Sequence, residues 1–289
     1  MIRNLVYNGG GILGAAYPGT DVVLENKGIL KGIEKVAGTS AGAIFALLQS
    51  LKFTAKEKFT IFESLDFSSF QDGNILDKVR VFETYGIHPG DVFLSWCKKI
   101  INWKGLNPNA TFKDFKYAGY LDLHTFAVSM DRGLVEHSYQ TTPDVSVCDA
   151  IRASMAIPIF FDAHEINGEY FVDGGLQNNY PINCFDTDNI PNPETLGFHL
   201  GLLGVTPELS KLQKGQIKEY CLRLFEQERN QQMIDLMSEP EDIKRTVFID
   251  TIGISATNFN CSTDEEMSLF KSGLSATESK LLHFPNILN

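Results

Sequence analysis

The sequence lacks paired cysteines, an excess of basic residues and any long apolar run. Its 289 residues include five cysteines without a C-x-x-C pair, which disfavours a disulfide framework or a zinc site and favours reduced thiols. The formal net charge of −11 argues against a general nucleic-acid binder and against electrostatic anchoring on anionic lipid surfaces. No apolar segment approaches the roughly 18 residues that a membrane-spanning helix needs, so we expect none.

The composition is that of an ordinary folded protein. Hydrophobic residues make up 43% and charged residues 21% of the chain, both typical of globular domains. No repeat, low-complexity tract or linker divides the sequence, so we expect a single domain over residues 1–289. Met1 is not followed by a secretory apolar segment. We therefore expect a cytoplasmic protein, or one exported without a cleavable signal peptide.

The beginning of the chain alternates between strand-like and helix-like segments. Residues 5–7 are a buried-strand candidate, and an apolar-periodic stretch follows to Asn26, within which Pro18 should kink or delay the helix. A second strand ends at Val36-Ala37, and residues 41–51 form an apolar helix. This alternation predicts an α/β fold in which helices cover parallel strands.

Later segments continue the pattern. Asp131-Arg132-Gly133 and Asn167-Gly168 are turn signals that each join two strand candidates. Thr263-x-x-Glu266 fits a capping box for a final helix. The other expected elements are strands at 125–130, 135–139, 164–166, 169–172, 196–200 and 247–250, and helices at 145–154 and 215–237.

Residues 53–120 differ in character, because phenylalanines there are spread among charges and are interrupted by glycine and proline. We expect a mostly helical, Phe-rich insertion that caps an active site. The alternative is that these rings are ordinary core packing for their own helices, as aromatic stripes usually are. The phenylalanines concerned are Phe53, Phe59, Phe62, Phe67, Phe70, Phe82 and Phe93.

The pentapeptide G-T-S-A-G at 38–42 ends the second strand and begins the next helix. A serine in such a strand-to-helix turn has an exposed hydroxyl, a strained backbone and small neighbours that let a substrate approach. Ser40 is therefore a candidate nucleophile for acyl transfer.

A glycine cluster, G-G-G-I-L-G at 9–14, follows the first strand. Its spacing, with Glu34 farther on, matches a dinucleotide-binding fingerprint. Glu34, however, stands at the start of the second strand, whereas a ribose-binding acid belongs at its end. In the other interpretation the N–H groups of Gly10 and Gly11 point at a developing oxyanion. The nearby serine turn favours the oxyanion.

Ser40 needs a base that accepts its hydroxyl proton. None of the six histidines (His88, His124, His137, His164, His199 and His283) stands in a recognisable triad context. Asp173 is the better candidate, because it ends a hydrophobic strand and is followed by two glycines that permit close approach. Asp-Gly is also an ordinary hairpin turn, although the Asn-Asn-Tyr-Pro segment that follows indicates an irregular polar loop.

Taken in order, these motifs resemble those of the patatin-like phospholipase family. The resemblance rests on the glycine cluster at 9–14, the serine turn at 38–42, A-S-M-A-I-P at 153–158 and D-G-G at 173–175 with its polar tail, and it extends to F-I-D-T-I-G-I-S at 248–255. It covers most of the chain. It implies a three-layer α/β/α fold with a mostly parallel central sheet.

The resemblance also implies a lipid acyl hydrolase of the phospholipase A type that uses no metal and no cofactor. Ser40 would attack an ester carbonyl, and Asp173 would take its proton and later activate water. Family substrates are glycerophospholipids and related acyl esters, so we expect peripheral membrane contact and no nucleic-acid partner, with a protein activator left open. The oxyanion would be held by Gly9, Gly10, Gly11 and Ala41, and the remaining motif glycines are Gly14, Gly38, Gly42, Gly174 and Gly175.

Two positions depart from the family's pattern. Many members carry a basic residue where this chain has Leu13, and Pro18 is unusual in the first helix. These departures support an alternative in which a silent hydrolase fold only binds membranes or proteins. A further alternative is an acyltransferase related to the carrier-protein transacylases, for which Arg152 is the only arginine near a motif.

Overall fold

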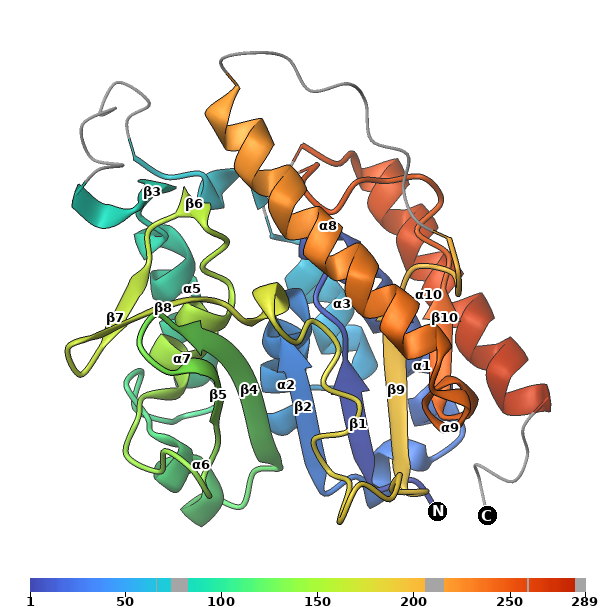
Figure 1. Cartoon of the computed structure of the whole chain (residues 1–289). Helices are drawn as coiled ribbons and strands as arrows, with labels where there is room; N and C mark the ends of the chain where they lie inside the picture. Colours follow the sequence, from blue (N-terminus) through green and yellow to red (C-terminus); the bar gives the residue numbers. More distant parts are fainter. Residues whose placement is uncertain (66, 74–82, 206–215, 259, 284–289) are drawn as a thin grey trace.

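The computed structural model describes residues 1–65, 67–73, 83–205, 216–258 and 260–283. Its centre is an eight-stranded sheet in the order β10-β9-β1-β2-β4-β8-β7, with β5 also paired to β4 (Figure 1). Neighbouring strands from β10 to β4 run parallel, whereas β5, β7 and β8 are antiparallel to their neighbours. The expected α/β fold with a mostly parallel central sheet is confirmed.

Each parallel strand is buried on both faces. Successive side chains of a strand point to opposite faces: Leu5 and Val36 join the main core, whereas Val6 and Ala37 join a smaller core on the other face. The parallel strands are β1 (Asn4–Tyr7), β2 (Lys35–Thr39), β4 (Asp122–Ser129), β9 (Thr195–Leu200) and β10 (Thr246–Ile249).

Helices cover the face of the main core, and α8 (Ile217–Met237) crosses the carboxyl ends of β1 and β9 (Figure 1). On the opposite face, Ile182 and Phe185 pack against the smaller core. They belong to an irregular segment that precedes β9. The helices of the main layer are α1 (Tyr17–Asn26), α2 (Ala41–Ser50), α3 (Ala55–Glu63), α7 (Val147–Ser154) and α10 (Thr263–His283).

The start of α1 agrees with the sequence prediction, and the start of α10 differs from it. Pro18 delays the first helix: a 3-10 turn over Gly11–Ala16 precedes α1, and Pro18 is its second residue, where no intrahelical N–H is needed. The capping box of α10 lies one residue earlier than expected. Ser262 N donates to Glu265 Oε2 at 2.8 Å, and Glu265 N donates to Ser262 Oγ at 3.3 Å.

Both predicted hairpins are present. β4 pairs with β5 (Gly133–His137), and β7 (His164–Ile166) pairs with β8 (Glu169–Asp173). A separate two-stranded sheet joins β3 (Gly86–His88) to β6 (Ile159–Phe161).

The described part of 53–120 is mostly helical, with α3, a 3-10 turn over Phe67–Phe70, α5 (Asp91–Trp103) and α6 (Phe112–Tyr117). Core packing is confirmed for the rings that lie in the main core, which are Phe53, Phe62, Phe70 and Phe93. Phe59 packs on Phe270 with ring centroids 4.9 Å apart. Phe82 and the side chain of Phe67 lie outside the described residues. That the segment caps the active site stays a prediction.

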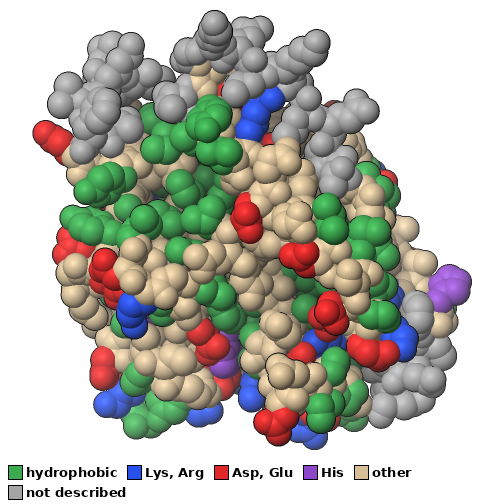
Figure 2. All heavy atoms as spheres, in the orientation of Figure 1, with side chains coloured by type: hydrophobic (Ala, Val, Ile, Leu, Met, Phe, Trp, Pro, Cys, Tyr) green, Lys and Arg blue, Asp and Glu red, His purple; other side chains and the backbone are tan. Residues whose placement is uncertain are grey.

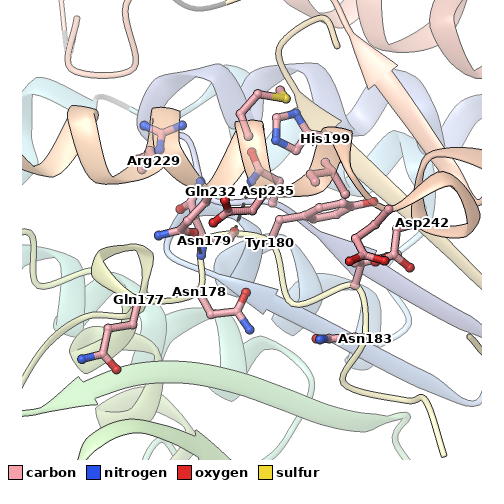
Figure 3. Close-up of a pocket in the computed structure, with 15 residues that line it drawn as sticks. Gln177, Asn178, Asn179, Tyr180, Asn183, His199, Arg229, Gln232, Asp235 and Asp242 are labelled. Carbon is pink, nitrogen blue, oxygen red and sulfur yellow. Dashed lines mark hydrogen bonds between the residues drawn. The ribbon is translucent and has the colours of Figure 1, made fainter. Parts of the chain in front are cut away.

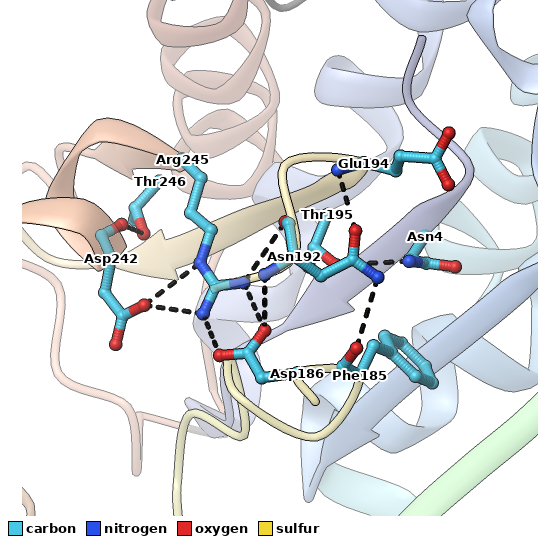
Figure 4. Close-up of polar contacts among 9 residues, drawn as sticks. All are labelled: Asn4, Phe185, Asp186, Asn192, Glu194, Thr195, Asp242, Arg245 and Thr246. Carbon is cyan, nitrogen blue, oxygen red and sulfur yellow. Dashed lines mark hydrogen bonds and ion pairs between the residues drawn. The ribbon is translucent and has the colours of Figure 1, made fainter. Parts of the chain in front are cut away.

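Arg245 ties α9 (Pro240–Lys244) and β10 to the segment before β9 (Figure 4). Its guanidinium donates two hydrogen bonds of 2.6 Å to Asp186 and bonds of 2.6 and 3.0 Å to Asp242. The Arg245 side chain is 8% exposed, so this charge is buried but fully paired, as a buried charge must be. The network therefore fixes the ends of α9 and β10 on the irregular segment.

No helix within the described ranges has the length and apolar character needed to cross a bilayer. All five cysteines are free thiols. Burial and the neighbouring Cys148 thiol raise the pKa of Cys97 well above its usual value.

Candidate active site

Ser40 stands between β2 and α2 with φ 55° and ψ −125°, a strained conformation for a residue other than glycine. Two glycines of the turn let strand and helix approach closely. A Cβ atom on Gly38 would lie 2.2 Å from the Gly42 carbonyl oxygen, and one on Gly42 would lie 2.2 Å from the Tyr7 carbonyl oxygen. The turn thus presents Ser40 at the amino end of α2, next to the end of β1.

Asp173 ends β8 and is fully buried. Its Oδ1 accepts a hydrogen bond of 2.7 Å from Gly175 N, whereas Oδ2 is buried without a hydrogen bond to any described residue. Burial raises the pKa of Asp173 to about 7, against the opposing effects of the Ser40 hydroxyl, the Gly175 N–H and the Arg229 charge. The structure therefore brings Ser40 beside a carboxyl group that changes protonation near neutral pH.

Glycines also allow the aspartate loop to lie against the serine turn. A Cβ atom on Gly174 would lie 3.0 Å from Thr39 Cγ2, and one on Gly175 would lie 2.7 Å from Asn179 Oδ1. In addition, Thr39 Oγ1 donates a hydrogen bond of 2.9 Å to Asn178 O. Larger residues at either glycine would push the two loops apart.

The A-S-M-A-I-P segment at 153–158 connects to both candidate residues. Ser40 N donates a hydrogen bond of 2.9 Å to Ser154 Oγ, and Asp173 N donates one of 2.8 Å to Ala156 O. One short segment after α7 therefore fixes the backbone of the nucleophile and that of the base.

The glycine loop provides fewer oxyanion donors than expected. Gly9 N donates to Asn179 O at 2.9 Å, so this N–H already has an acceptor, and an oxyanion role for Gly9 stays a prediction that this bond disfavours. The N–H groups of Gly10, Gly11 and Ala41 have no backbone partner among the described residues. Together with the position of Ala41 at the start of α2, this leaves three free donors next to Ser40.

Gly14 allows the glycine loop to pack on the serine turn, since a Cβ atom there would lie 3.3 Å from Ala41 Cβ. Leu13, the residue that stands where many family members carry a basic one, is only 5% exposed and belongs to the main core. The glycine loop therefore carries no cation.

The middle of α8 covers Ser40. Leu222, Phe225, Glu226 and Arg229 of α8 line a cavity of about 10 Å³ with Ser40, which is room for about one water molecule. A second small cavity of about 30 Å³ beside Ser40 is apolar and is lined by Ile44, Phe70, Met155, Ile157 and Phe161. Both cavities are smaller than an acyl ester.

The residues named for the dinucleotide-binding and acyltransferase alternatives lie away from the cavities at Ser40. Glu34 forms an ion pair with Arg3 at the amino end of β2, opposite the edge that holds Ser40, so it is not placed to bind a ribose. Arg152 is 2% exposed, its Nη2 donates to two backbone carbonyl groups at 2.6 and 3.0 Å, and it lines neither cavity at Ser40. Within the described ranges, no histidine lines either cavity at Ser40.

In the described part of the chain, no group of three or more His, Cys, Asp or Glu side chains is placed to hold a metal ion. The sequence interpretation missed two polar residues of α8. Arg229 Nη2 donates to Gly9 O at 3.3 Å, and Gln232 bridges Asn179 N (2.7 Å) and Gly175 O (3.0 Å). No local pattern marks them, because they reach the site only through the crossing of α8.

Comparison with known proteins gives a family match. The model of the patatin-like phospholipases matches residues 5–186. Among curated proteins, the chain is 26% identical over 299 residues to the uncharacterized protein YqhO of Bacillus subtilis (strain 168), covering 94% of this chain and 96% of that protein. It is 28% identical over 185 residues to the probable lipid hydrolase 463L of Invertebrate iridescent virus 6, covering 62% of each.

Solved structures share the fold. The crystal structure of VipD from Legionella pneumophila superposes with a TM-score of 0.66 at 19% identity, over 98% of this chain and 67% of VipD. The type III effector ExoU superposes with a TM-score of 0.55 at 16% identity, and this chain spans 53% of its length. At these identities the likeness concerns the fold alone.

Proposed function

This chain belongs to the patatin-like phospholipase family, a family of lipid hydrolases, and on that premise we propose that it is a phospholipase A-type acyl hydrolase that acts through Ser40 and Asp173. The observation that carries the proposal is the buried, unpaired Oδ2 of Asp173 beside Ser40. A carboxylate with a pKa of about 7 is a competent general base near neutral pH.

In the proposed mechanism, Ser40 Oγ attacks the ester carbonyl carbon while its proton passes to Asp173. The N–H groups of Gly10, Gly11 and Ala41 stabilise the negative oxygen of the tetrahedral intermediate. The intermediate collapses to an acyl-enzyme, and the departing alcohol takes the proton from Asp173. Asp173 then removes a proton from water, which attacks the acyl group and releases the fatty acid and free Ser40.

The apolar cavity beside Ser40 supports a fatty-acyl substrate. Its side chains, which include Ile44, Phe70 and Phe161, belong to three different elements and are all buried. Such a lining favours a hydrocarbon chain over a polar acyl group.

Access from a membrane surface also has support. Figure 2 shows hydrophobic side chains gathered over β6, β7 and the first turns of α8. Exposed apolar residues on and beside these elements include Tyr170, Tyr220 and Leu224. An apolar patch next to the lipid-binding cavity favours peripheral contact with a bilayer through apolar insertion.

The experiment that tests the proposal is mass spectrometry of the lipids released from phosphatidylcholine vesicles, together with hydrolysis of a short p-nitrophenyl ester. We expect free fatty acid from the wild type and none from Ser40→Ala or Asp173→Asn. Ser50→Ala is the matched control, because Ser50 is a buried serine that donates to Leu121 O at 2.7 Å, away from the cavities at Ser40. Full activity of either dyad variant would disprove the dyad.

Two further measurements separate the alternatives. A fluorophosphonate probe should label Ser40, whereas a silent binding module would leave it unmodified. An acceptor alcohol added to the assay should not take the acyl group in place of water. Transfer to the alcohol as the main product would identify an acyltransferase.

A further inference from the structure

A larger cavity, of about 280 Å³, lies between α8 and the loop after Asp173 (Figure 3). This volume is close to the lower end of the roughly 300–1,000 Å³ that small-ligand sites occupy. The cavity has a polar lining. Amide groups come from Asn8, Asn178, Asn179, Asn183, Gln177 and Gln232, and charges come from both α8 and α9.

Arg229 belongs to the walls of this cavity and of the small cavity that contains Ser40. Its only hydrogen bond among the described residues is the long one of 3.3 Å from Nη2 to Gly9 O, and its Nε is buried without a partner. No carboxylate in the described ranges forms a direct ion pair with it, and the charges of Asp173 and Glu226 favour the charged form of Arg229 only from a greater distance. A guanidinium keeps its charge in a protein, so Arg229 is a largely buried cation with unused donors.

A buried cation of this kind is stabilised by an anion that accepts its hydrogen bonds. In a glycerophospholipid the anion nearest to the acyl esters is the phosphodiester, which is joined to the same glycerol. Because Leu13 leaves the glycine loop without a charge, Arg229 is the cation that the described structure places next to Ser40.

The charged side chains that line the cavity change sign along the chain, from the cation Arg229 to the anions Asp235 and Glu239. Arg229, Gln232, Asp235 and Glu239 follow one another at spacings of three or four residues, which places them along one side of the α8 helix and its carboxyl end. Asp235 and Glu239 are exposed and have no cationic partner among the described residues, although Asp235 Oδ1 accepts a hydrogen bond of 2.9 Å from Gln231 Nε2. His199 adds no charge, because burial lowers its pKa to about 4.

We propose that this cavity is the headgroup subsite for a zwitterionic glycerophospholipid, with Arg229 bound to the phosphodiester and Asp235 and Glu239 bound to the ammonium group. A primary ammonium, as in an ethanolamine headgroup, fits best. Carboxylates and amide oxygens accept hydrogen bonds that a quaternary ammonium does not donate, and the described lining offers no cage of Trp, Tyr and Phe rings, because Tyr180 is its one residue of these three types. The net charge of −11 agrees with a zwitterionic rather than an anionic substrate. This inference rests on the proposed function.

The test compares four lipids with identical acyl chains in neutral detergent micelles: phosphatidylethanolamine, phosphatidylcholine, phosphatidylglycerol and diacylglycerol. For the wild type we expect the largest kcat/KM with phosphatidylethanolamine, at least about tenfold above phosphatidylglycerol and above diacylglycerol. Arg229→Gln should lower the ratio of kcat/KM for phosphatidylethanolamine to that for diacylglycerol about tenfold, chiefly through KM. Arg229→Lys, which keeps the charge, should restore part of the ratio.

Arg223→Gln is the matched control, because Arg223 lies on the same helix, bonds Glu219 at 3.0 Å and does not line the cavity. It should keep the wild-type ratio. Asp235→Asn combined with Glu239→Gln should reduce the preference for phosphatidylethanolamine over phosphatidylglycerol to near one. Thermal unfolding of each variant verifies that it is folded, and the ratios do not depend on the amount of active protein.

The outcomes distinguish the two proposals. Equal rates of the wild type on phosphatidylethanolamine and phosphatidylglycerol, or an unchanged ratio in Arg229→Gln, would overturn the headgroup subsite and leave the hydrolase standing. Absence of hydrolysis of all four lipids, with Ser40 unlabelled by the fluorophosphonate, would overturn the hydrolase and the subsite with it.

Discussion

Ser154 Oγ accepts the hydrogen bond of Ser40 N at 2.9 Å and donates its own proton to Phe126 O at 2.6 Å. Ser154 is fully buried, so no water replaces it. Through this one hydroxyl, the strained serine turn is held against β4, the strand that also pairs with β8 and Asp173. The distance between nucleophile and base thus depends on a residue that touches no substrate.

Ser154→Ala removes the partner of two buried backbone groups. We expect the free energy of unfolding to fall by about 1–3 kcal/mol, and kcat to fall at least about tenfold because the nucleophile shifts. Ser50→Ala should lose stability similarly and keep its kcat, since Ser50 bonds Leu121 O far from the site. Urea unfolding and ester hydrolysis measure both effects. A wild-type kcat in Ser154→Ala would show that the turn holds without this bond.

The raised pKa of Asp173 predicts the pH dependence of the reaction. Because only the ionised carboxylate accepts the Ser40 proton, kcat/KM should rise with pH through a midpoint near the pKa of about 7 and then level off. Arg229 lowers this pKa, so Arg229→Gln should move the midpoint to higher pH, and Arg223→Gln should not. A rise of the wild-type kcat/KM with a midpoint near pH 4 would contradict Asp173 as the base.

The same pKa predicts a stability effect of opposite sign to that of most carboxylates. The folded pKa of about 7 lies above the usual value of 3.8, so the folded state holds a proton that the unfolded state releases. The protonated carboxyl of Asp173 therefore contributes to the free energy of unfolding. That contribution is complete below about pH 4 and is lost as the pH rises through 7. The free energy of unfolding should therefore fall less over this range in Asp173→Asn than in the wild type. Parallel curves for the two proteins would be inconsistent with a raised pKa.

Local sequence patterns pointed to Ser40 and Asp173, the candidate site residues that lie in short motifs. Ser40 and Asp173 were chosen because each follows or ends a strand and has adjacent glycines; β8 lies where the apolar pattern placed it, whereas β2 continues two residues past the predicted end, to Thr39. Two details were ambiguous at that level. Ser262 and Thr263 each have a glutamate three residues later, so either fits a capping box, and whether the N–H of Gly9 is free depends on its distant partner Asn179.

Such sequence patterns could not identify Arg229 as a residue of the site, for a physical reason. The helix α8 carries apolar residues on its buried side, such as Leu222 and Phe225, and on its exposed side, such as Leu224 and Ile234. Periodicity therefore does not indicate which side faces the protein. Only the tertiary crossing of α8 over β1 decides that Arg229 reaches the glycine loop.

Leu224 tests the membrane contact. It lies on the outer side of α8 and is 54% exposed. Leu224→Asp adds a charge that opposes insertion into the apolar part of a bilayer, so we expect weaker binding to phosphatidylcholine vesicles and several-fold slower hydrolysis there. Leu282→Asp is the control, because Leu282 is even more exposed, at 73%, but stands in the last turn of α10. Equal vesicle binding by the two variants would argue against this face.

Phe225 tests whether α8 limits access to Ser40. Its ring lines the cavity of about 10 Å³ at Ser40, and a Cβ atom on Gly175 would lie 2.9 Å from Phe225 Cζ. Phe225→Ala opens space directly above the nucleophile, so kcat/KM for a short soluble ester should rise several-fold even as the protein loses about 3–5 kcal/mol of stability. Leu281→Ala, a buried change on α10, should lose stability without a gain in rate. If Phe225→Ala shows no gain either, entry is limited by another part of the structure, and α8 is a fixed wall of the site rather than its gate.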